Sequence, residues 1–351
     1  MNLMIGTDQA GQGGISSVVS VLERDGFLQR KNIKYIPSHI DGTRWKKLSK
    51  ALEAFFSVLM ICTVSRPHIV HAHAASRASF MRKSIFLGMA RSFGCKTIFH
   101  LHGGEFHHFA ENEAGFAKRW WIRRTLQKST KVIALSRSWA EFLERYAPES
   151  EVCVVPNAVQ FNKSAQTFTE EPGRILFLGR PEKEKGIFEL LTAITLIKDH
   201  YPELKLAIAG DGDLEALQER VDQQGIGQYV EILGWIDPDR RATELARAAL
   251  FVLPSYNEGL PMAMLEAMSA GKAIVVTPVG GIPETVTDNF NGLFVPPADA
   301  AALSSAIKNL LGDQTLRETL GRNARQTIEL GYSTDTALEK LAAVYAEIES
   351  Q

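Results

Sequence analysis

The stretch Pro254-Ser-Tyr-Asn-Glu258-Gly-Leu-Pro261-Met-Ala-Met-Leu-Glu266-Ala-Met-Ser-Ala-Gly271-Lys272 places two carboxylates eight positions apart. The four apolar residues before it, 250–253, are typical of a buried strand, and residues 254–259 are turn formers. Pro261 suits the first turn of a helix, and residues 262–270 are strong helix formers. The sequence therefore predicts Glu258 in a loop at the carboxyl end of a strand, and Glu266 inside the helix that follows.

The junction between this loop and helix predicts a binding site for an anion. Backbone N–H groups at Gly259, Leu260 and Met262 would lie where a helix begins, without partners inside the helix and at the positive end of its dipole. The two carboxylates can accept hydrogen bonds from hydroxyl groups. An anionic ligand that carries several hydroxyls fits both features.

Short apolar runs alternate with helix-length segments along the whole chain, which predicts βαβ units and an α/β protein with parallel sheets. The runs fall into two series: 3–6, 33–37, 69–73, 97–101, 132–135 and 152–156, then 175–179, 206–210, 230–233, 250–254, 273–277 and 293–295. Two doubly wound, Rossmann-like domains are therefore expected, over residues 1–160 and 174–331.

The polar stretch between the two series predicts a linker over residues 161–173. Residues 332–351 are expected to form a separate C-terminal helix, for which a return to the first domain is one option. Ligands of doubly wound sheets collect at the carboxyl ends of the strands. The expected active site is therefore a central cleft between the two facing domains.

The composition indicates a globular protein with two cores, because the 351 residues are 45% hydrophobic. No secretory leader is recognised in the first residues, and the apolar run 51–64, which contains Glu53, is too short to span a bilayer and predicts a core helix. The three cysteines lack CxxC spacing, which favours a reducing cytosol.

The charge is divided unequally along the chain. Residues 1–165 contain 23 Lys and Arg against 12 Asp and Glu, a net charge of +11, which leaves −12 for the remainder. This asymmetry predicts an anionic partner for the first half, either a phospholipid surface or nucleic acid. Since no nucleic-acid motif accompanies the charge, a membrane surface is the partner expected.

Two glycine-containing loops are candidates for phosphate binding. Gly13 and Gly14 follow the first predicted strand and open a helix, where backbone N–H groups can approach a phosphate or a sugar. Their spacing differs from G-x-G-x-x-G, which argues against a nicotinamide cofactor. Arg180, Lys185 and Gly186 follow the first strand of the second series, and two cations there suit a diphosphate, although a solvated charged turn is the alternative.

The histidines are concentrated in the first half, at 71, 73, 100, 102, 107 and 108. Residues two apart on a strand face the same side, so a metal cluster is one interpretation. Hydrogen-bonded structural histidines are the interpretation preferred, and no metal is expected. His102 differs from the others because it ends a strand, before Gly103-Gly104, at the edge where a ligand is expected.

A predicted helix around Lys118-Arg-Trp-Trp-Ile-Arg-Arg124 combines aromatic residues with cations. This combination suits a bilayer interface. The alternative is a solvated helix whose tryptophans pack inward.

Together these motifs resemble the retaining glycosyltransferases of family 4, which have the two-domain GT-B fold. The resemblance covers nearly the whole chain. It consists of Gly13-Gly14, His102, Val155-Pro-Asn157, Gly179-Arg180, Lys185-Gly186, Gly210-Asp-Gly212, Leu233-Gly234, the pair Glu258-x7-Glu266, and Gly280-Gly-Ile-Pro283-Glu284.

The resemblance implies transfer of a sugar from a nucleotide diphosphate sugar with retention at the anomeric carbon. It further implies a role for each matching residue. Arg180 and Lys185 would bind the diphosphate and stabilise the leaving group, Glu258 would contact the donor sugar together with Gly259 and Leu260, Glu266 would bind the ribose, Gly13 and Gly14 would approach the diphosphate, and His102 would line the sugar site. No cofactor is implied, since the nucleotide sugar is a substrate.

The function expected is transfer of a hexose from a UDP- or GDP-sugar to a glycan acceptor, lipid-linked or soluble, in polysaccharide biosynthesis. The expected location is the cytoplasm, with an option of peripheral attachment to the cytoplasmic face of the inner membrane. Two alternatives stay open: a nucleotide-sugar 2-epimerase of the same architecture, which needs no acceptor, and a non-catalytic sugar-nucleotide-binding protein.

Overall fold

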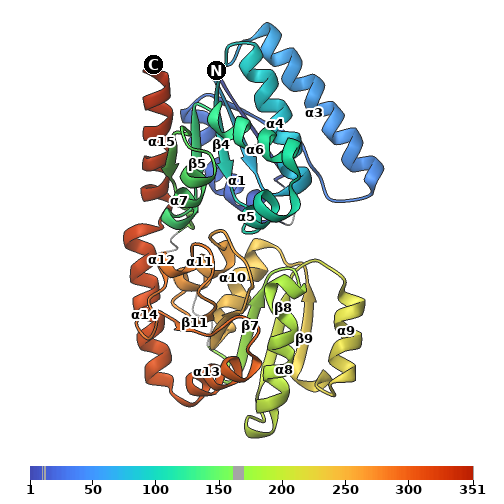
Figure 1. The fold of residues 1–351 in the computed structure, drawn as a ribbon. Helices are drawn as coiled ribbons and strands as arrows, with labels where there is room; N and C mark the ends of the chain where they lie inside the picture. Colours follow the sequence, from blue (N-terminus) through green and yellow to red (C-terminus); the bar gives the residue numbers. More distant parts are fainter. Residues whose placement is uncertain (10, 12, 161–169, 351) are drawn as a thin grey trace. The chain divides into compact units, whose positions relative to one another are not determined.

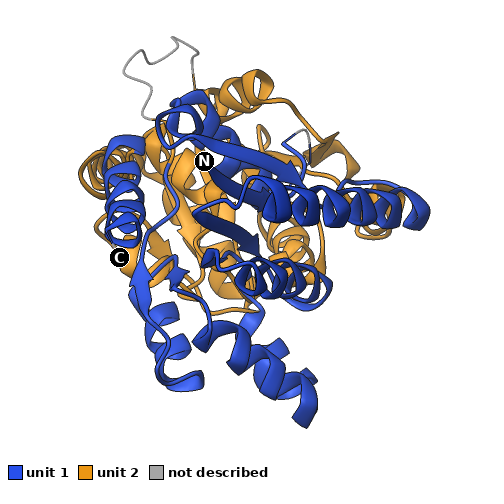
Figure 2. Cartoon of the chain, turned by 90° about the horizontal axis from the view of Figure 1, so that it is seen from above, with its two compact units in different colours: residues 1–158, 334–351 blue, residues 159–333 orange. Residues whose placement is uncertain are grey.

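The computed structural model describes residues 1–9, 11, 13–160 and 170–350, and the chain forms two compact units. Unit 1 comprises Met1–Ala158 and Thr334–Gln351, and unit 2 comprises Val159–Ser333 (Figure 2). Most of the predicted linker, residues 161–169, lies outside the described residues. The C-terminal helix belongs to unit 1 although unit 2 precedes it in the chain.

Unit 1 is built on a parallel sheet of six strands in the order β2-β1-β3-β4-β5-β6 (Figure 1). The strands are β1 Asn2–Gly6, β2 Ile33–Pro37, β3 Ile69–Ala74, β4 Lys96–Leu101, β5 Lys131–Ala134 and β6 Val152–Val154. The helices are α1 Gly14–Arg24, α2 Phe27–Arg30, α3 Arg44–Val64, α4 Arg77–Ser92, α5 Phe106–His108, the π-helix Phe109–Glu113, α6 Phe116–Gln127, α7 Arg137–Tyr146 and α15 Thr334–Glu349.

Unit 2 has a second parallel sheet of six strands in the order β12-β11-β10-β7-β8-β9, the order of a Rossmann fold. The strands are β7 Arg174–Leu178, β8 Lys205–Ala209, β9 Val230–Gly234, β10 Leu250–Leu253, β11 Ala273–Val276 and β12 Leu293–Phe294. The helices are α8 Ile187–Ile197, α9 Leu214–Gln223, α10 Pro238–Arg247, α11 Met262–Ser269, α12 Ile282–Thr285, α13 Ala300–Gly312 and α14 Gln314–Gly331, with 3-10 turns at Lys183–Lys185, Lys198–His200 and Gly227–Tyr229.

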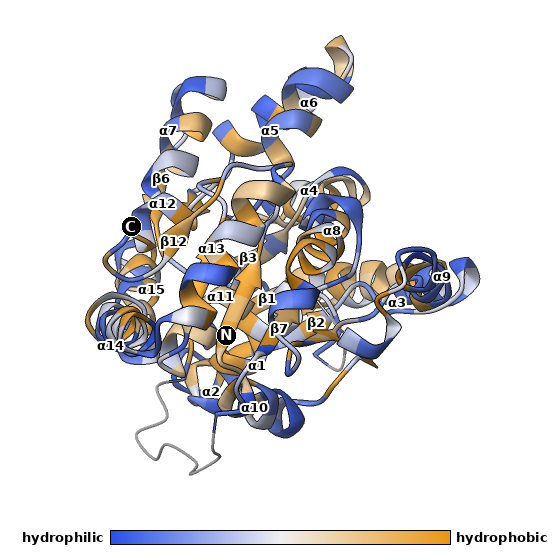
Figure 3. Cartoon of the chain, turned by 90° about the horizontal axis from the view of Figure 1, so that it is seen from below, coloured by the Kyte–Doolittle hydropathy of each residue, from blue (hydrophilic) through white to orange (hydrophobic). Residues whose placement is uncertain are grey.

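All twelve predicted strands form, with bounds within two residues of those expected. Their buried residues belong to two faces of each sheet, as parallel sheets covered on both sides require. Figure 3 shows the surface helix α9 largely in the hydrophilic colour. The predicted α/β architecture of two doubly wound domains is confirmed.

Alternate residues of the strands in unit 1 supply two separate cores. Leu3, Ile5 and Val70 face the core that contains α3, α4 and α7. Met4 and Ile69 face the opposite core, which α15 covers with five side chains: Leu338, Leu341, Val344, Tyr345 and Ile348. The last helix is therefore a structural part of the first domain.

The expectation of a core helix over residues 51–64 is wrong in one respect. Only one face of α3 is buried, through Ala54, Val58, Ile61 and Cys62. The opposite face is also apolar but exposed to solvent. The sequence pattern did not separate the two faces because both are apolar.

Candidate functional site

Three glycines let strand ends approach one another closely at the carboxyl edge of the sheet in unit 2. The N–H of Gly179 donates to the carbonyl of Ala209 (2.9 Å), and that of Gly210 donates to the carbonyl of Gly234 (2.9 Å). A Cβ atom at Gly210 would lie 2.0 Å from the carbonyl oxygen of Gly179. Any larger residue at position 210 would therefore separate the loops that follow β7 and β8.

The loop after β7 also packs directly on the loop after β10. Gly186, at φ 70°, is the N-cap residue directly before α8, and a Cβ atom there would lie 2.0 Å from the carbonyl oxygen of Pro254. Beside this contact the N–H of Tyr256 donates to the carbonyl of Glu184 (2.8 Å). These backbone contacts place Lys185 against the segment that contains Glu258.

Lys185 and Glu258 form an ion pair, with 2.6 Å between Nζ and Oε1. The hydroxyl of Ser255 donates to the same carboxylate oxygen at 2.7 Å. The Glu258 side chain is buried, whereas that of Lys185 is 31% exposed. A buried carboxylate is stable only when paired and hydrogen-bonded, and both conditions are met here.

The segment Gly280-Gly281 supports the Glu258 loop from behind. The N–H of Gly281 donates to the carbonyl of Gly259 (2.8 Å). Gly280 adopts φ 58°, and a Cβ atom there would lie 1.9 Å from the carbonyl oxygen of Glu258. The glycine pair noted in the sequence is thus explained by a close backbone approach to this loop.

Glu266 lies on α11, as predicted, and its carboxylate is held by a residue that the sequence analysis missed. Nη1 of Arg241 donates to both carboxylate oxygens, at 2.8 and 3.0 Å. Burial raises the pKa of Glu266, and the Arg241 guanidinium opposes that rise. Arg241 lies on α10, whose N-cap residue is Asp237. Its neighbours in the sequence are mostly charged, as on an exposed helix, so the sequence did not predict this contact.

Arg180 is more exposed than Lys185 and has a different partner. Its Nη2 lies 2.6 Å from Oδ2 of Asp211, and its side chain is 46% exposed. Asp213 caps α9 by accepting from the N–H of Ala216 at 3.0 Å. The two aspartates after β8 therefore have different partners: Asp211 pairs with Arg180, the residue predicted to bind the diphosphate, and Asp213 caps a helix.

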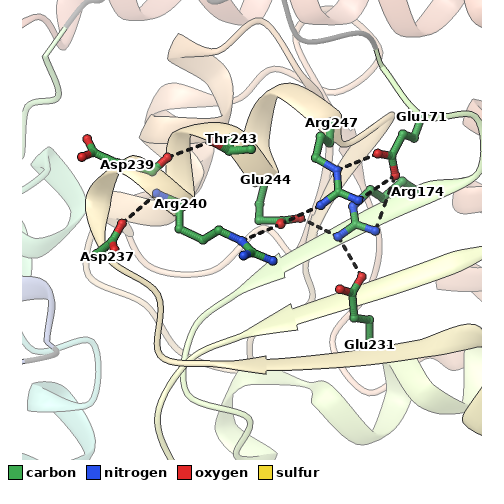
Figure 4. A network of polar contacts seen from close by, with 9 residues as sticks. All are labelled: Glu171, Arg174, Glu231, Asp237, Asp239, Arg240, Thr243, Glu244 and Arg247. Carbon is green, nitrogen blue, oxygen red and sulfur yellow. Dashed lines mark hydrogen bonds and ion pairs between the residues drawn. The ribbon is translucent and has the colours of Figure 1, made fainter.

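The polar network in Figure 4 lies at the opposite end of the strands of the same sheet, near their amino ends. Arg174, the first residue of β7, pairs with Glu244 at 2.5 Å, and both side chains are buried. Arg247 joins Glu244 to Glu171, at 2.9 and 2.6 Å. Since these groups lie at the amino end of β7, we interpret the network as structural.

In unit 1, Gly13 and Gly14 lie where α1 begins. A Cβ atom at either position would meet no described heavy atom within 4 Å. The local packing of unit 1 therefore gives no steric reason for these glycines. Their predicted role in approaching a diphosphate stays a prediction.

His102 follows β4 and is hydrogen-bonded to a second histidine, with 2.8 Å between its Nε2 and Nδ1 of His73. His71 and His100 form another such pair at 3.2 Å, and the hydroxyl of Tyr345 lies 3.0 Å from Nδ1 of His71. Burial lowers the pKa of all four histidines, that of His71 to about 3. The group is therefore neutral at physiological pH.

Nitrogens of His71, His73 and His100 lie within 4.8 Å of one another, as in a metal cluster. However, the ring of His71 stacks on those of His73 and His100, with interplanar angles of 21° and 18°. The lone pairs of stacked rings lie in separate, nearly parallel planes, whereas metal ligands must converge on one point. The geometry favours hydrogen-bonded pairs, the interpretation preferred from the sequence.

The tryptophans of α6 do not pack inward, so that alternative is wrong. Trp120 and Trp121 are 59% and 40% exposed, and the Arg124 guanidinium lies 5.5 Å from the centre of the Trp120 ring. Ile122 and Leu126 make the buried contacts of this helix. Among the described residues, no helix is both long and apolar enough to cross a membrane.

The structure thus brings some of the predicted site residues into contact within unit 2. Lys185 and Glu258 touch, and the Gly259-Leu260 segment continues from them toward α11. Glu266 and Arg180 have their own partners, Arg241 and Asp211. His102, Gly13 and Gly14 belong to unit 1.

Two protein families match the chain in succession. Residues 10–163 match the family described as Glycosyltransferase Family 4, and residues 159–327 match the one described as Glycosyl transferases group 1. Together the two matches extend from the first loop of unit 1 through most of unit 2.

Individual relatives agree with this assignment. The chain is 26% identical over 293 residues to a glycogen synthase of Mycobacterium tuberculosis, covering 80% of this chain and 69% of that protein. It is 28% identical over 337 residues to the phosphatidylinositol N-acetylglucosaminyltransferase gpi3 subunit of Schizosaccharomyces pombe, covering 91% and 69%. The structure of Anabaena Alr3699/HepE, solved in complex with UDP and glucose, superimposes with a TM-score of 0.78 at 16% identity, covering 99% of this chain and 100% of that one. The chain is therefore a GT-B glycosyltransferase and belongs to family 4.

Proposed function

We propose that this glycosyltransferase moves a hexose from a UDP- or GDP-sugar to a hydroxyl of a glycan acceptor, with retention at the anomeric carbon. The observation that carries the proposal is the ion pair of Lys185 and Glu258 at the carboxyl edge of the sheet in unit 2. It combines a cation for the diphosphate with a carboxylate for sugar hydroxyls, at the sheet edge where nucleotides bind in doubly wound folds.

Each predicted residue then has a physical task. Lys185 and Arg180 neutralise the diphosphate. The diphosphate competes for these two cations with their carboxylate partners, Glu258 and Asp211. The N–H groups of Gly259 and Leu260, just before α11, bind sugar hydroxyls or phosphate. Glu266 accepts from the ribose hydroxyls, and Arg241 opposes the rise in its pKa that burial causes. In unit 1, His102 lines the sugar site, and Gly13 and Gly14 approach the diphosphate.

The transfer breaks the bond between the anomeric carbon and the leaving phosphate oxygen, and forms a bond to the acceptor oxygen on the same face. The leaving phosphate oxygen takes the proton of the incoming hydroxyl. Lys185 and Arg180 stabilise the negative charge that develops on that phosphate, which is the task a metal ion performs in other transferases. In this proposal the reaction requires no metal, and the carboxylates recognise the donor rather than act as base.

The acceptor proposed is a lipid-linked glycan at the cytoplasmic face of a membrane, in cell-surface or exopolysaccharide biosynthesis. The relatives include an enzyme named for a phosphatidylinositol and one named for glycogen, so their names include both a lipid and a polysaccharide. The positive charge of unit 1 and the exposed tryptophans of α6 favour an anionic membrane surface. The enzyme would be a peripheral protein of that surface.

A panel of nucleotide sugars, with isoprenoid-diphosphate-linked and soluble glycan acceptors, tests the proposal. We expect transfer from one donor, with Arg180→Ala and Glu266→Ala abolishing it. Arg322→Ala and Glu318→Ala, exposed on α14, serve as matched controls that keep full activity. NMR of the product gives the anomeric configuration. Interconversion of donors without an acceptor would instead identify a 2-epimerase, and binding without turnover a non-catalytic protein.

A further inference from the structure

The long helix α3 of unit 1 exposes a continuous apolar stripe. Its members recur every three or four residues along the whole helix, and their exposed fractions range from 50% to 80%. They are Trp45 80%, Leu48 51%, Leu52 50%, Phe56 63%, Met60 60% and Val64 78%. Soluble surfaces show single exposed apolar residues commonly, but a contiguous set of this size indicates a surface that is covered in use.

The stripe lies opposite the buried face of the helix. At 100° per residue its six members cover an arc of about 160°. The four buried residues, Ala54, Val58, Ile61 and Cys62, occupy the opposite side. The helix contacts α4 and β2, and Figure 1 shows it beside α4. From Trp45 to Val64 the stripe is about 28 Å long. It is therefore an elongated apolar strip on a helix that is anchored from behind.

The charges around the stripe indicate what covers it. Residues 44–64 include four basic residues, Arg44, Lys46, Lys47 and Lys50, and one acidic residue, Glu53, which pairs with Lys50 at 2.7 Å. Arg44, Lys46 and Lys47 are exposed at the start of the helix, beside Trp45. Tryptophan beside cations, with leucine, phenylalanine and methionine behind them, is the composition of a helix that lies in a bilayer interface.

Unit 1 as a whole also has a net positive charge. Unit 1 contains 23 Lys and Arg against 16 Asp and Glu, a net charge of +7. A second copy of the chain docked through α3 would bring two positive units together, whereas an anionic bilayer is complementary to them. We infer that α3 is the membrane-inserting element of this protein, with the stripe in the acyl boundary of an anionic leaflet and its basic end at the lipid phosphates. This inference names the surface behind the membrane association included in the proposed function.

Flotation of the full chain with vesicles tests the inference separately from catalysis. Binding is expected to mixed phosphatidylglycerol and phosphatidylcholine vesicles and to be weak with phosphatidylcholine alone. The combined variant Trp45→Ser, Phe56→Ser, Met60→Ser should lower binding at least about ten-fold, because three large apolar groups leave the bilayer. The pair Lys46→Gln, Lys47→Gln should lower it about ten-fold or more and reduce its salt dependence.

Two controls are available in the same chain. Leu196→Ser, Leu330→Ser removes two apolar residues of unit 2 that are 54% and 74% exposed, and should not change binding. Phe116→Ser, Trp120→Ser alters α6; loss of binding in this variant alone, with normal binding of the α3 variant, would overturn the inference. So would a stripe variant that binds like the wild type, or a stripe whose replacement changes only the oligomeric state measured by light scattering.

The substituted α3 positions are exposed, so the fold should survive, and far-UV circular dichroism checks it. If the triple variant unfolds, the lysine pair decides the question in the same assay. Transfer to a soluble acceptor is expected to continue in all α3 variants. Vesicle binding that fails while this transfer persists refutes the inference and leaves the glycosyltransferase proposal standing. Vesicle binding as expected, with no sugar transfer by the wild type, refutes the proposed function and leaves the membrane-docking surface standing.

Discussion

Arg241 holds Glu266 by donating from one guanidinium nitrogen to both carboxylate oxygens, at 2.8 and 3.0 Å. The contact joins α10 to α11 and fixes the carboxylate that we propose for the ribose. Burial raises the pKa of Glu266, and the nearby cation opposes that rise, which favours the carboxylate form that accepts hydrogen bonds.

Arg241→Ala should therefore weaken donor binding rather than the chemical step. A charged hydrogen bond contributes roughly 1.5–3 kcal/mol, so the donor KM should rise about ten- to hundred-fold while kcat changes little. Loss of the cation raises the pKa of Glu266 further, so the rise in KM should be larger at low pH. Steady-state kinetics over a pH series measure both effects. Arg240→Ala, one residue earlier on α10, is the control; an equal effect there would argue against positioning by Arg241.

Lys185→Ala leaves the buried Glu258 carboxylate without its cation. We expect a loss of about 1–2 kcal/mol in the free energy of unfolding, below the value for a fully buried pair, because the Lys185 side chain is 31% exposed. The double variant Lys185→Ala, Glu258→Gln should recover part of that stability, since no uncompensated charge remains. Urea unfolding of the two single variants and the double variant gives the coupling energy.

Activity distinguishes the two roles of this pair. All three variants should lose transfer, including the restabilised double variant, because the diphosphate and sugar contacts are gone. A double variant that is both stable and active would show that the ion pair only supports the loop.

Gly280→Ala should displace the Glu258 loop. Position 280 has φ 58°, and the added Cβ atom would lie 1.9 Å from the carbonyl oxygen of Glu258. The strained backbone and the clash should together lower the free energy of unfolding by about 1–3 kcal/mol and reduce transfer strongly. Gly115→Ala provides the matched control, because its φ is −69° and a Cβ atom meets no described heavy atom within 4 Å. Thermal unfolding and donor turnover of both variants provide the measurement.

The strands and their order in the chain could be predicted from the sequence because buried parallel strands are short apolar runs bounded by turn formers, as 250–253 before Pro254 illustrates. The glycines could be singled out from the sequence, and the structure explains why no side chain fits there. A Cβ atom added at Gly186, Gly210 or Gly280 would lie within 2.0 Å of a carbonyl oxygen. Such approaches join segments far apart in sequence, so they are not predictable from local pattern.

Side-chain partners were the least predictable feature. Arg241 has no motif and meets Glu266 only because α10 and α11 lie together. The prediction that α3 is a core helix was wrong for a related reason. An apolar run in the sequence does not indicate which face of the helix packs against a neighbouring element. Both cases depend on contacts between elements, which composition and periodicity do not record.

The four buried histidines on β3, on β4 and directly after β4 should make unit 1 sensitive to acid. Their pKa values lie below the value of about 6.5 for an unfolded chain, with His71 at about 3, so the unfolded state binds more protons as the pH falls below 6.5. Stability is fully present above pH 6.5 and is lost as the pH falls toward the folded values. At pH 5 a histidine such as His71 should cost about 2 kcal/mol of stability.

Tryptophan fluorescence can follow this loss in unit 1 alone, because four of the five tryptophans lie there and Trp235→Phe removes the other. In that background, urea midpoints should fall from pH 7 to pH 5. Replacing His71 and His100 by Gln should flatten the dependence, since these side chains no longer take up protons on unfolding. His200→Gln, an exposed histidine of unit 2, should leave it unchanged. A midpoint that is constant over this pH range in the parent would show that the buried histidines are not held neutral.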